Sequence, residues 1–193
     1  IRQASLLWRE SCSVAVVADA FPVNVNLADQ VSTRWIPPHG LFKENCDASF
    51  ASKGKKTSLV VILRDWKGQL IDGGVSTVHI SSVAQGEARA IRLACMFLQA
   101  LGLSHVKVES DCNSVIDLCV SELVSPWECL AYLADIRSMG QASSYSFSWE
   151  PTIANSVTHW LASSRMHDVF TLDLISNPLM YLRNFLVFDS FVA

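Results

Sequence analysis

The chain has 193 residues, of which 50% are hydrophobic and 17% are charged, and its mean hydropathy is +0.28. This length and composition suit one folded domain with flanking segments and exclude a largely disordered protein. A formal charge of −3 argues against a whole-surface electrostatic grip on nucleic acid, and the longest purely apolar run, Leu59–Leu63, is far too short to span a membrane. The chain begins with Ile and no basic stretch precedes an apolar one, so we expect a fragment or a processed end rather than a secretory signal.

The cysteines show no C-x-x-C pair, and most occupy positions where an apolar side chain would fit. Reduced core thiols in an intracellular protein of the nucleus or cytoplasm are therefore favoured over disulfides. The six cysteines are Cys12, Cys46, Cys95, Cys112, Cys119 and Cys129.

The first half of the chain predicts a flanking segment and then three strands. Two prolines in "STRWIPPHG" place a linker that ends near Gly40, so residues 1–40 form the expected flanking segment. Alternating or β-branched residues predict strands over 41–52, 57–65 and 69–80, joined by the turns "KGKK" and "DWKG". Gly73 and Gly74 predict an irregularity in the third strand. The three strands should form an antiparallel meander.

From Ser82 onward the spacing of apolar residues becomes helical. Ser82 and Gln85 form a capping-box pattern that opens a helix, which should end at Leu101 with Gly102 as its left-handed stop. The remaining patterns predict a strand over 105–110, helices over 112–121 and 126–140, a strand over 143–150 and a final helix over 153–166. Pro126 should open the second of these helices and Gly140 should close it. The order of types, β-β-β-α-β-α-α-β-α, indicates an α/β fold with a mixed five-stranded sheet and helices on its faces.

Asp111 has two interpretations. It lies in "ESDCN", between a strand and a helix, where Asp111 or Ser110 would serve as an N-cap. Alternatively, Asp111 is one of several carboxylates gathered at one end of the sheet to bind a metal, because ligand sites in such sheets open beyond the strand ends.

Two further carboxylates favour the metal interpretation. Asp47 lies in a predicted strand, although aspartate resists burial there, and Glu87 heads an apolar helical stripe. A solvent-facing strand position and a helix-dipole effect are the alternatives for these two residues. In the predicted topology the first and fourth strands are neighbours, which brings Asp47, Glu87 and Asp111 within reach of one point. Such a cluster needs a cation, and oxygen ligands suit Mg²⁺ or Mn²⁺.

The motifs, in order, are "W-x-P-P-x-G", "K-x-N-C-D-A-S-F", "V-x-L-R-D-x-x-G", "Q-G-E-A-R-A", "V-x-V-E-S-D" and "A-N-S-V-T-H-W-L-A". With this order and spacing, the chain resembles the ribonuclease H family between about Trp35 and Met166. More narrowly, it is similar to the ribonuclease H-like domains of plants that are related to reverse transcriptases of non-LTR retroelements. The resemblance implies a ribonuclease H-like fold over about 41–167, followed by an apolar tail over 168–193 that would pack on the domain or on a partner.

The resemblance also implies a function. It predicts a metal-dependent endonuclease that hydrolyses the RNA strand of an RNA/DNA hybrid, with two Mg²⁺ or Mn²⁺ ions and no small-molecule cofactor. Asp47, Glu87 and Asp111 take the first three acidic positions as metal ligands, and His159 takes the fourth catalytic position. Hybrid selection would come from shape and from contacts to 2′-hydroxyls.

Two residues depart from the family pattern. His159 stands where a carboxylate is common, and Trp149 stands where the family often has histidine, so turnover would suffer. A second hypothesis is therefore a nucleic-acid-binding or protein-interaction module that has lost catalysis, and a third is a scaffold without any nucleic-acid role. We expect nucleic-acid contacts from the basic turn, although a solvated hairpin tip is the alternative, and from the last motif. The residues concerned are Lys53, Lys55, Lys56 and Asn155.

Overall fold

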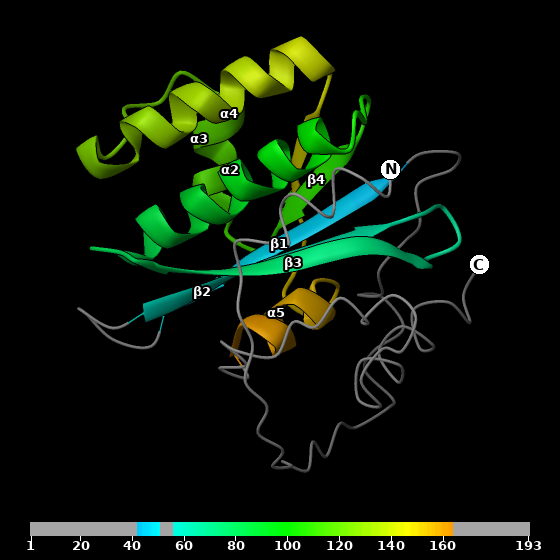
Figure 1. Ribbon diagram of the computed structural model, residues 1–193. Coiled ribbons are helices and arrows are strands. Elements are labelled where there is room, and N and C mark those ends of the chain that lie inside the picture. The colour runs from blue at the N-terminus through cyan, green and yellow to red at the C-terminus, as the bar shows by residue number, and fades with distance from the viewer. Residues whose placement is uncertain (1–41, 51–55, 164–193) are drawn as a thin grey trace.

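The computed structural model describes residues 42–50 and 56–163 (Figure 1). The predicted flanking segment 1–40, the predicted tail 168–193 and the basic turn that contains Lys53 and Lys55 lie outside these residues. No helix of the described ranges is long and apolar enough to cross a bilayer.

One mixed sheet forms the centre of the fold, with the strand order β3-β2-β1-β4-β5. The first three strands are an antiparallel meander, whereas β4 runs parallel to β1 and β5 runs parallel to β4. The predicted meander and the predicted contact between the first and fourth strands are therefore confirmed. The strands are β1 (Lys43–Ser49), β2 (Lys56–Arg64), β3 (Leu70–His79), β4 (Lys107–Ser110) and β5 (Ser146–Trp149).

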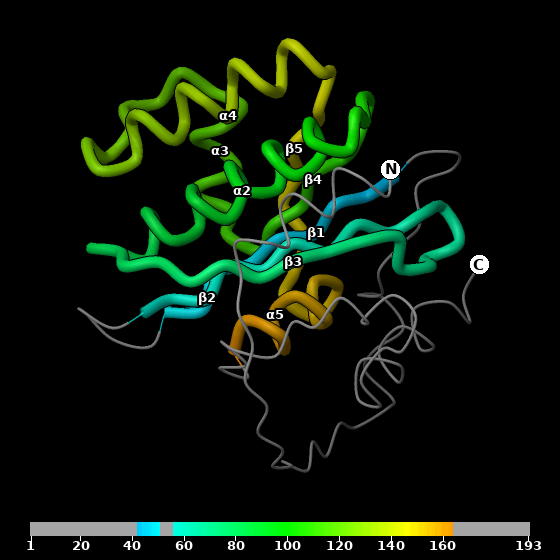
Figure 2. Tube along the Cα trace, in the orientation of Figure 1, coloured from blue at the N-terminus to red at the C-terminus, as the bar shows by residue number. Residues whose placement is uncertain are grey.

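Helices cover both faces of this sheet, with α2, α3 and α4 on one face and α5 on the other (Figures 1 and 2). This order of elements confirms the predicted α/β class. Strand β1 is buried on both faces, as a central strand between two helical layers must be. The helices are α2 (Val83–Ala100), α3 (Asn113–Val120), α4 (Leu130–Ser143) and α5 (Ser156–Ser163), with a 3₁₀ turn, η2 (Trp127–Cys129), before α4.

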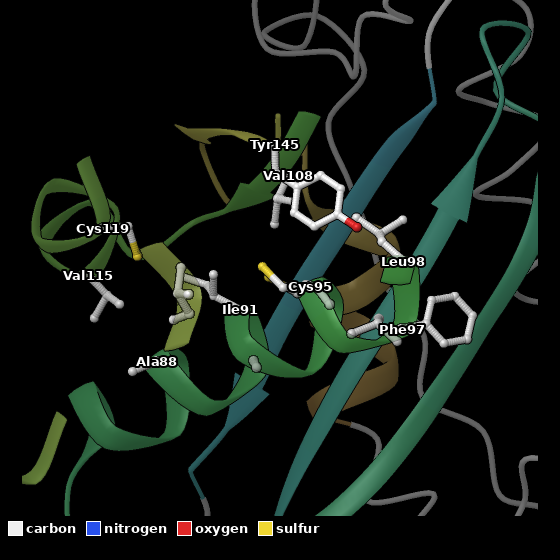
Figure 3. Close-up of a cluster of buried hydrophobic side chains, with 14 of the residues drawn as sticks. Ala88, Ile91, Cys95, Phe97, Leu98, Val108, Val115, Cys119 and Tyr145 are labelled. Atoms are coloured by element: carbon white, nitrogen blue, oxygen red, sulfur yellow. The ribbon is translucent and has the colours of Figure 1, made fainter. Parts of the chain in front are cut away.

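The larger core lies between α2 and the sheet. Ile91, Cys95 and Leu98 of α2 are fully buried and belong to one cluster with Val108 of β4 and Tyr145 (Figure 3). Burial raises the pKa of the Cys95 and Cys119 thiols, which keeps both protonated. The five cysteines within the described ranges are free thiols, as the sequence predicts.

The start and the end of α2 agree with the predicted signals. Ser82 is the N-cap and its Oγ accepts a hydrogen bond from the Gln85 backbone N at 3.2 Å. The Gln85 side chain turns back to the Ser81 backbone N, at 2.7 Å, so the box is completed one residue earlier than its usual form. Gly102 has φ +69°, which only glycine adopts without strain, and it follows directly on the last turn.

The irregularity predicted at Gly73 and Gly74 was wrong in its position. The register shifts opposite Leu63 and Arg64, where β3 skips Ile71, whereas the two glycines pair regularly with Ile62 and Val61. A Cβ on Gly73 would lie 2.7 Å from the Val61 carbonyl oxygen. Glycine is needed there because β3 approaches β2 closely, not because the strand bends.

Gly140 does not close α4, contrary to the prediction. The helix continues to Ser143, and the left-handed residue is Ser144, with φ 57°. Gly140 is buried inside the helix, and a Cβ there would lie 2.7 Å from the Phe147 ring of β5. The glycine therefore allows α4 to lie close to the sheet edge.

Replacing Gly140 by alanine should lower the free energy of unfolding by about 1–2 kcal/mol, because the clash with Phe147 outweighs the better helix propensity of alanine. Chemical denaturation measures the change. The exposed α4 position Ser138 supplies the matched control, since Ser138→Ala should be neutral or slightly stabilising. The double variant G140A/F147L should recover most of the loss; no recovery would place the strain elsewhere.

Several charged residues are buried in the fold. Lys43, Arg64 and Glu109 are exposed by 2%, 0% and 0% of their surface, respectively. The Lys43 Nζ lies 2.7 Å from Glu109 Oε1, and Asn45 bridges Glu109 and Arg64 with hydrogen bonds of 3.0 and 2.9 Å. Lys43 and Arg64 are thus enclosed in the fold and cannot contribute to a basic surface patch.

Candidate metal centre

The site lies at the carboxyl ends of the neighbouring parallel strands β1 and β4. Asp47 is on β1 and only 3% exposed. Its Oδ1 accepts a hydrogen bond from the Ala48 backbone N at 2.7 Å, while its Oδ2 lies 3.1 Å from His159 Nδ1 of α5. The hydrogen bond with Asp47 is the main cause of a raised His159 pKa, which favours the imidazolium. The His159 side chain remains 51% exposed, so it is open to a ligand from solvent.

Asp111 follows β4 directly and faces the same point. Its Oδ2 lies 3.9 Å from His159 Nδ1. The predicted cap function of Asp111 was wrong, because the N-cap of α3 is Cys112 and no side chain caps that helix. Trp149 Nε1 donates a hydrogen bond to the Asp111 backbone carbonyl at 3.0 Å and so fixes this segment to β5. The Asp111 carboxylate is therefore not used as a helix cap and lies near His159 instead.

Glu87 of α2 lies near enough to Asp47 and Asp111 for their charges to act on it, but it is not one of the three residues whose ligand atoms lie within 4.8 Å of one another. It heads the predicted stripe, whose Ile91, Ala94 and Leu98 are all fully buried, and it is itself 6% exposed. Burial, followed by the charges of Asp47 and Asp111, raises the pKa of the Glu87 carboxyl from 4.5 to about 9. Within the described ranges, its buried Oε2 has no hydrogen-bond partner.

Asn155 has a structural role that the sequence did not indicate. It is fully buried, and its Nδ2 donates to the Cys46 carbonyl at 3.0 Å, while its Oδ1 accepts from the Thr158 hydroxyl. The predicted nucleic-acid contact of Asn155 does not agree with this burial. Because Cys46 adjoins Asp47, and because the His159 backbone N donates to the Asn155 carbonyl, Asn155 holds α5 where His159 meets Asp47.

The structure describes only one of the three lysines predicted to contact nucleic acid in the basic turn. Lys56 is exposed at the first position of β2, whereas Lys53 and Lys55 lie outside the described residues. Sequence patterns also missed Thr152, which forms a side-chain hydrogen bond that lowers the Asp111 pKa against the raising effect of burial. No periodicity or spacing distinguishes Thr152 from other loop residues.

Comparison with known proteins identifies the family of this chain. Residues 45–165 match a family model described as reverse transcriptase-like, which covers well over half of the chain. The chain belongs to the reverse transcriptase-like family. No curated protein matches the sequence significantly.

Solved structures show that the fold of this reverse transcriptase-like chain is that of ribonuclease H. The N-terminal RNase H domain of a Mycobacterium tuberculosis protein is 12% identical, with a TM-score of 0.59 over 65% of this chain and 92% of that one. RNase H1 of Halobacterium salinarum is 14% identical, with a TM-score of 0.56 over 61% and 90%. LC11-RNase H1, solved in complex with an RNA/DNA hybrid, is 16% identical, with a TM-score of 0.53 over 60% and 88%.

The donor set of the reverse transcriptase-like domain fits a divalent cation. Asp47, Asp111 and His159 each offer one ligand atom, and these atoms lie within 4.8 Å of one another. Glu87 adds a third carboxyl nearby, whose pKa is raised first by burial and then by the charges of Asp47 and Asp111; a cation would offset the second effect. Carboxylate oxygens favour Mg²⁺ or Mn²⁺, and the imidazole nitrogen shifts the preference toward Mn²⁺.

Proposed function

We propose that this reverse transcriptase-like domain cleaves the RNA strand of RNA/DNA hybrids as a metal-dependent endonuclease, with two Mg²⁺ or Mn²⁺ ions. The observation that carries the proposal is the convergence of Asp47, Asp111 and His159 at the end of the parallel strands, with Glu87 behind them. The fold is shared with an RNase H1 that was solved with such a hybrid. Free thiols support an intracellular location, in the nucleus or cytoplasm.

We assign two roles to the site residues, metal binding and proton transfer. Asp47 and Asp111 would hold the ions, and Glu87 would supply a third carboxylate in its ionised form. Bound divalent ions would activate water and stabilise the leaving oxygen. His159, hydrogen-bonded to Asp47 and half exposed, would bind metal as a neutral imidazole or exchange a proton with solvent near the scissile bond.

A labelled RNA/DNA hybrid incubated with the full chain and Mg²⁺ or Mn²⁺ tests the proposal. We expect internal cleavage of the RNA strand with either ion, stronger with Mn²⁺, and no cleavage in EDTA. Single-stranded RNA and duplex DNA of the same sequence control for specificity. A folded sample that leaves the hybrid intact with both metals would refute the proposal.

A second candidate is a nucleic-acid-binding or protein-interaction module that has lost turnover. His159 favours this candidate, because an imidazole is a poorer Mg²⁺ ligand than a carboxylate. Trp149 also favours it, because its indole N–H donates a hydrogen bond to the Asp111 carbonyl and cannot transfer protons as a histidine would. Hybrid binding without cleavage, retained after a carboxylate is restored at position 159, would support this candidate over the nuclease.

Replacing His159 by aspartate should raise Mg²⁺-supported cleavage about tenfold or more relative to Mn²⁺-supported cleavage, because Mg²⁺ prefers oxygen ligands. Initial rates with each ion measure the ratio. The variant His159→Asn keeps a short polar side chain without the new charge and serves as the control. An equal change with both ions would mean that residue 159 does not contact the metal.

A further inference from the structure

The chain from the last residue of α3 to the first residue of α4 exposes five large apolar side chains within eleven residues. Val120 is 61% exposed, Leu123 59%, Val124 97%, Trp127 81% and Leu130 55%. We call these five residues the α3–α4 apolar surface. Single exposed apolar residues are ordinary, but a cluster that includes a largely exposed tryptophan is typical of a protein interface.

This surface is held in place rather than loosely arranged. The Arg137 guanidinium of α4 donates hydrogen bonds to the Leu118 and Ser121 carbonyls at 2.6 and 2.7 Å, which closes the end of α3. At the other end of the loop, the Glu128 carboxylate accepts a hydrogen bond from Ser82 Oγ at 2.7 Å. The loop is thus fixed to α4 and to the start of α2 while its apolar side chains face solvent, so a partner would find a preorganised surface.

The charged residues of the segment that carries this surface have one sign. Between Asn113 and Leu130 the sequence contains Asp117, Glu122 and Glu128 and no lysine, arginine or histidine. The nearest cation in the next helix, Arg137, is already bound to backbone carbonyls. Phosphate groups of nucleic acid or anionic lipid would be repelled here, and a two-fold contact with a second copy would face three carboxylates with three others.

We propose that the α3–α4 apolar surface docks a basic amphipathic segment of another protein. Its apolar side chains would cover Val124 and Trp127, and its Lys or Arg residues would pair with Glu122 and Asp117. The eight residues of α3, about 12 Å of helix, separate the site residue Asp111 from Val120, so the docked segment leaves the metal centre open. The proposal stands independently of nuclease activity.

The test uses the full chain as bait for a random peptide library displayed on phage, with the W127S variant for counter-selection. We expect the peptides enriched on the unmodified chain to combine Lys or Arg with large apolar residues. The dissociation constant of the best synthetic peptide should increase at least about tenfold for Trp127→Ser, Val124→Ser and Glu122→Lys. It should also increase with salt.

Met96→Ser provides the matched control, because Met96 is a 44% exposed apolar residue of α2 outside the surface. This variant should bind the peptide like the unmodified chain, and thermal unfolding should show that all variants remain folded. The proposal is overturned if the selected peptides are acidic, if no peptide depends on Trp127, or if sedimentation shows self-association that Trp127→Ser abolishes.

Discussion

Replacing Asp111 by asparagine should reduce metal-dependent cleavage of the hybrid at least about 100-fold while leaving the fold equally or more stable. Activity is lost because the amide supplies one neutral oxygen in place of a carboxylate at the point where Asp47 and His159 converge. Stability is retained because burial and the Asp47 charge already raise the Asp111 pKa, so that removing the charge relieves repulsion.

Two measurements separate these effects. Initial cleavage rates with Mg²⁺ and Mn²⁺ report the metal centre, and chemical denaturation in EDTA reports the fold. Asp117→Asn is the matched control, since it makes the same change on an exposed residue of α3 and should alter neither quantity by much. A clear loss of stability in the Asp111 variant would contradict the repulsion argument, and unchanged activity would remove Asp111 from the site.

Replacing Glu87 by glutamine should change how the metal-free protein responds to pH. The folded-state pKa of Glu87 is about 9, against an ordinary value of 4.5. Between these values the unfolded chain loses the proton while the folded chain keeps it, so the stabilisation present at low pH is lost as the pH rises. The Glu87 contribution to the free energy of unfolding should fall by about 1.4 kcal/mol per pH unit in this window. The variant lacks this fall, so its advantage should grow from pH 5 to pH 8.

Denaturation midpoints at several pH values, in EDTA and then with Mn²⁺, measure this behaviour. Saturating metal should stabilise the unmodified chain most at high pH, because protons then compete less with the metal for the carboxylates. The glutamine variant should be stabilised less, because it lacks one of these carboxylates. Glu44 supplies a control, since its fully buried carboxyl also has a raised pKa but its charged neighbour is Asp72 rather than Asp47 or Asp111. Glu44→Gln should remove its own pH-dependent loss and keep the metal response. Parallel pH curves for the unmodified chain and the Glu87 variant would show that Glu87 is already ionised in the fold.

The order of elements could be predicted because each signal is local. Ser82 and Gly102 bound α2 through hydrogen bonds and φ angles formed within a few residues, and the apolar stripe from Glu87 to Leu98 needs only the helical period. The approach of Asp47 to Asp111 followed from one further step, the parallel pairing of β1 with β4.

What could not be predicted depends on contacts between distant residues. Gly140 reads as a helix stop, yet its role is set by the Phe147 ring on β5. Glu109 reads as a surface charge, but Lys43 from β1 and Lys107 neutralise it within the fold. Asn155 matches a nucleic-acid contact by motif, whereas its partner is a carbonyl 109 positions earlier in the chain. Spacing along the sequence contains none of these pairings.

The bond between Asn155 and the Cys46 carbonyl also has a consequence for biosynthesis. Asp47 leaves the ribosome 112 residues before His159, a delay of about 6–20 s at ordinary rates of translation. During that interval the nascent chain gains the rest of the meander and then α2, but it lacks α5, which carries His159. A product that terminates before Asn155 would retain the sheet and the carboxylates of Asp47, Glu87 and Asp111 but lack His159, so under the proposed function truncated chains should be poorly active rather than unregulated nucleases.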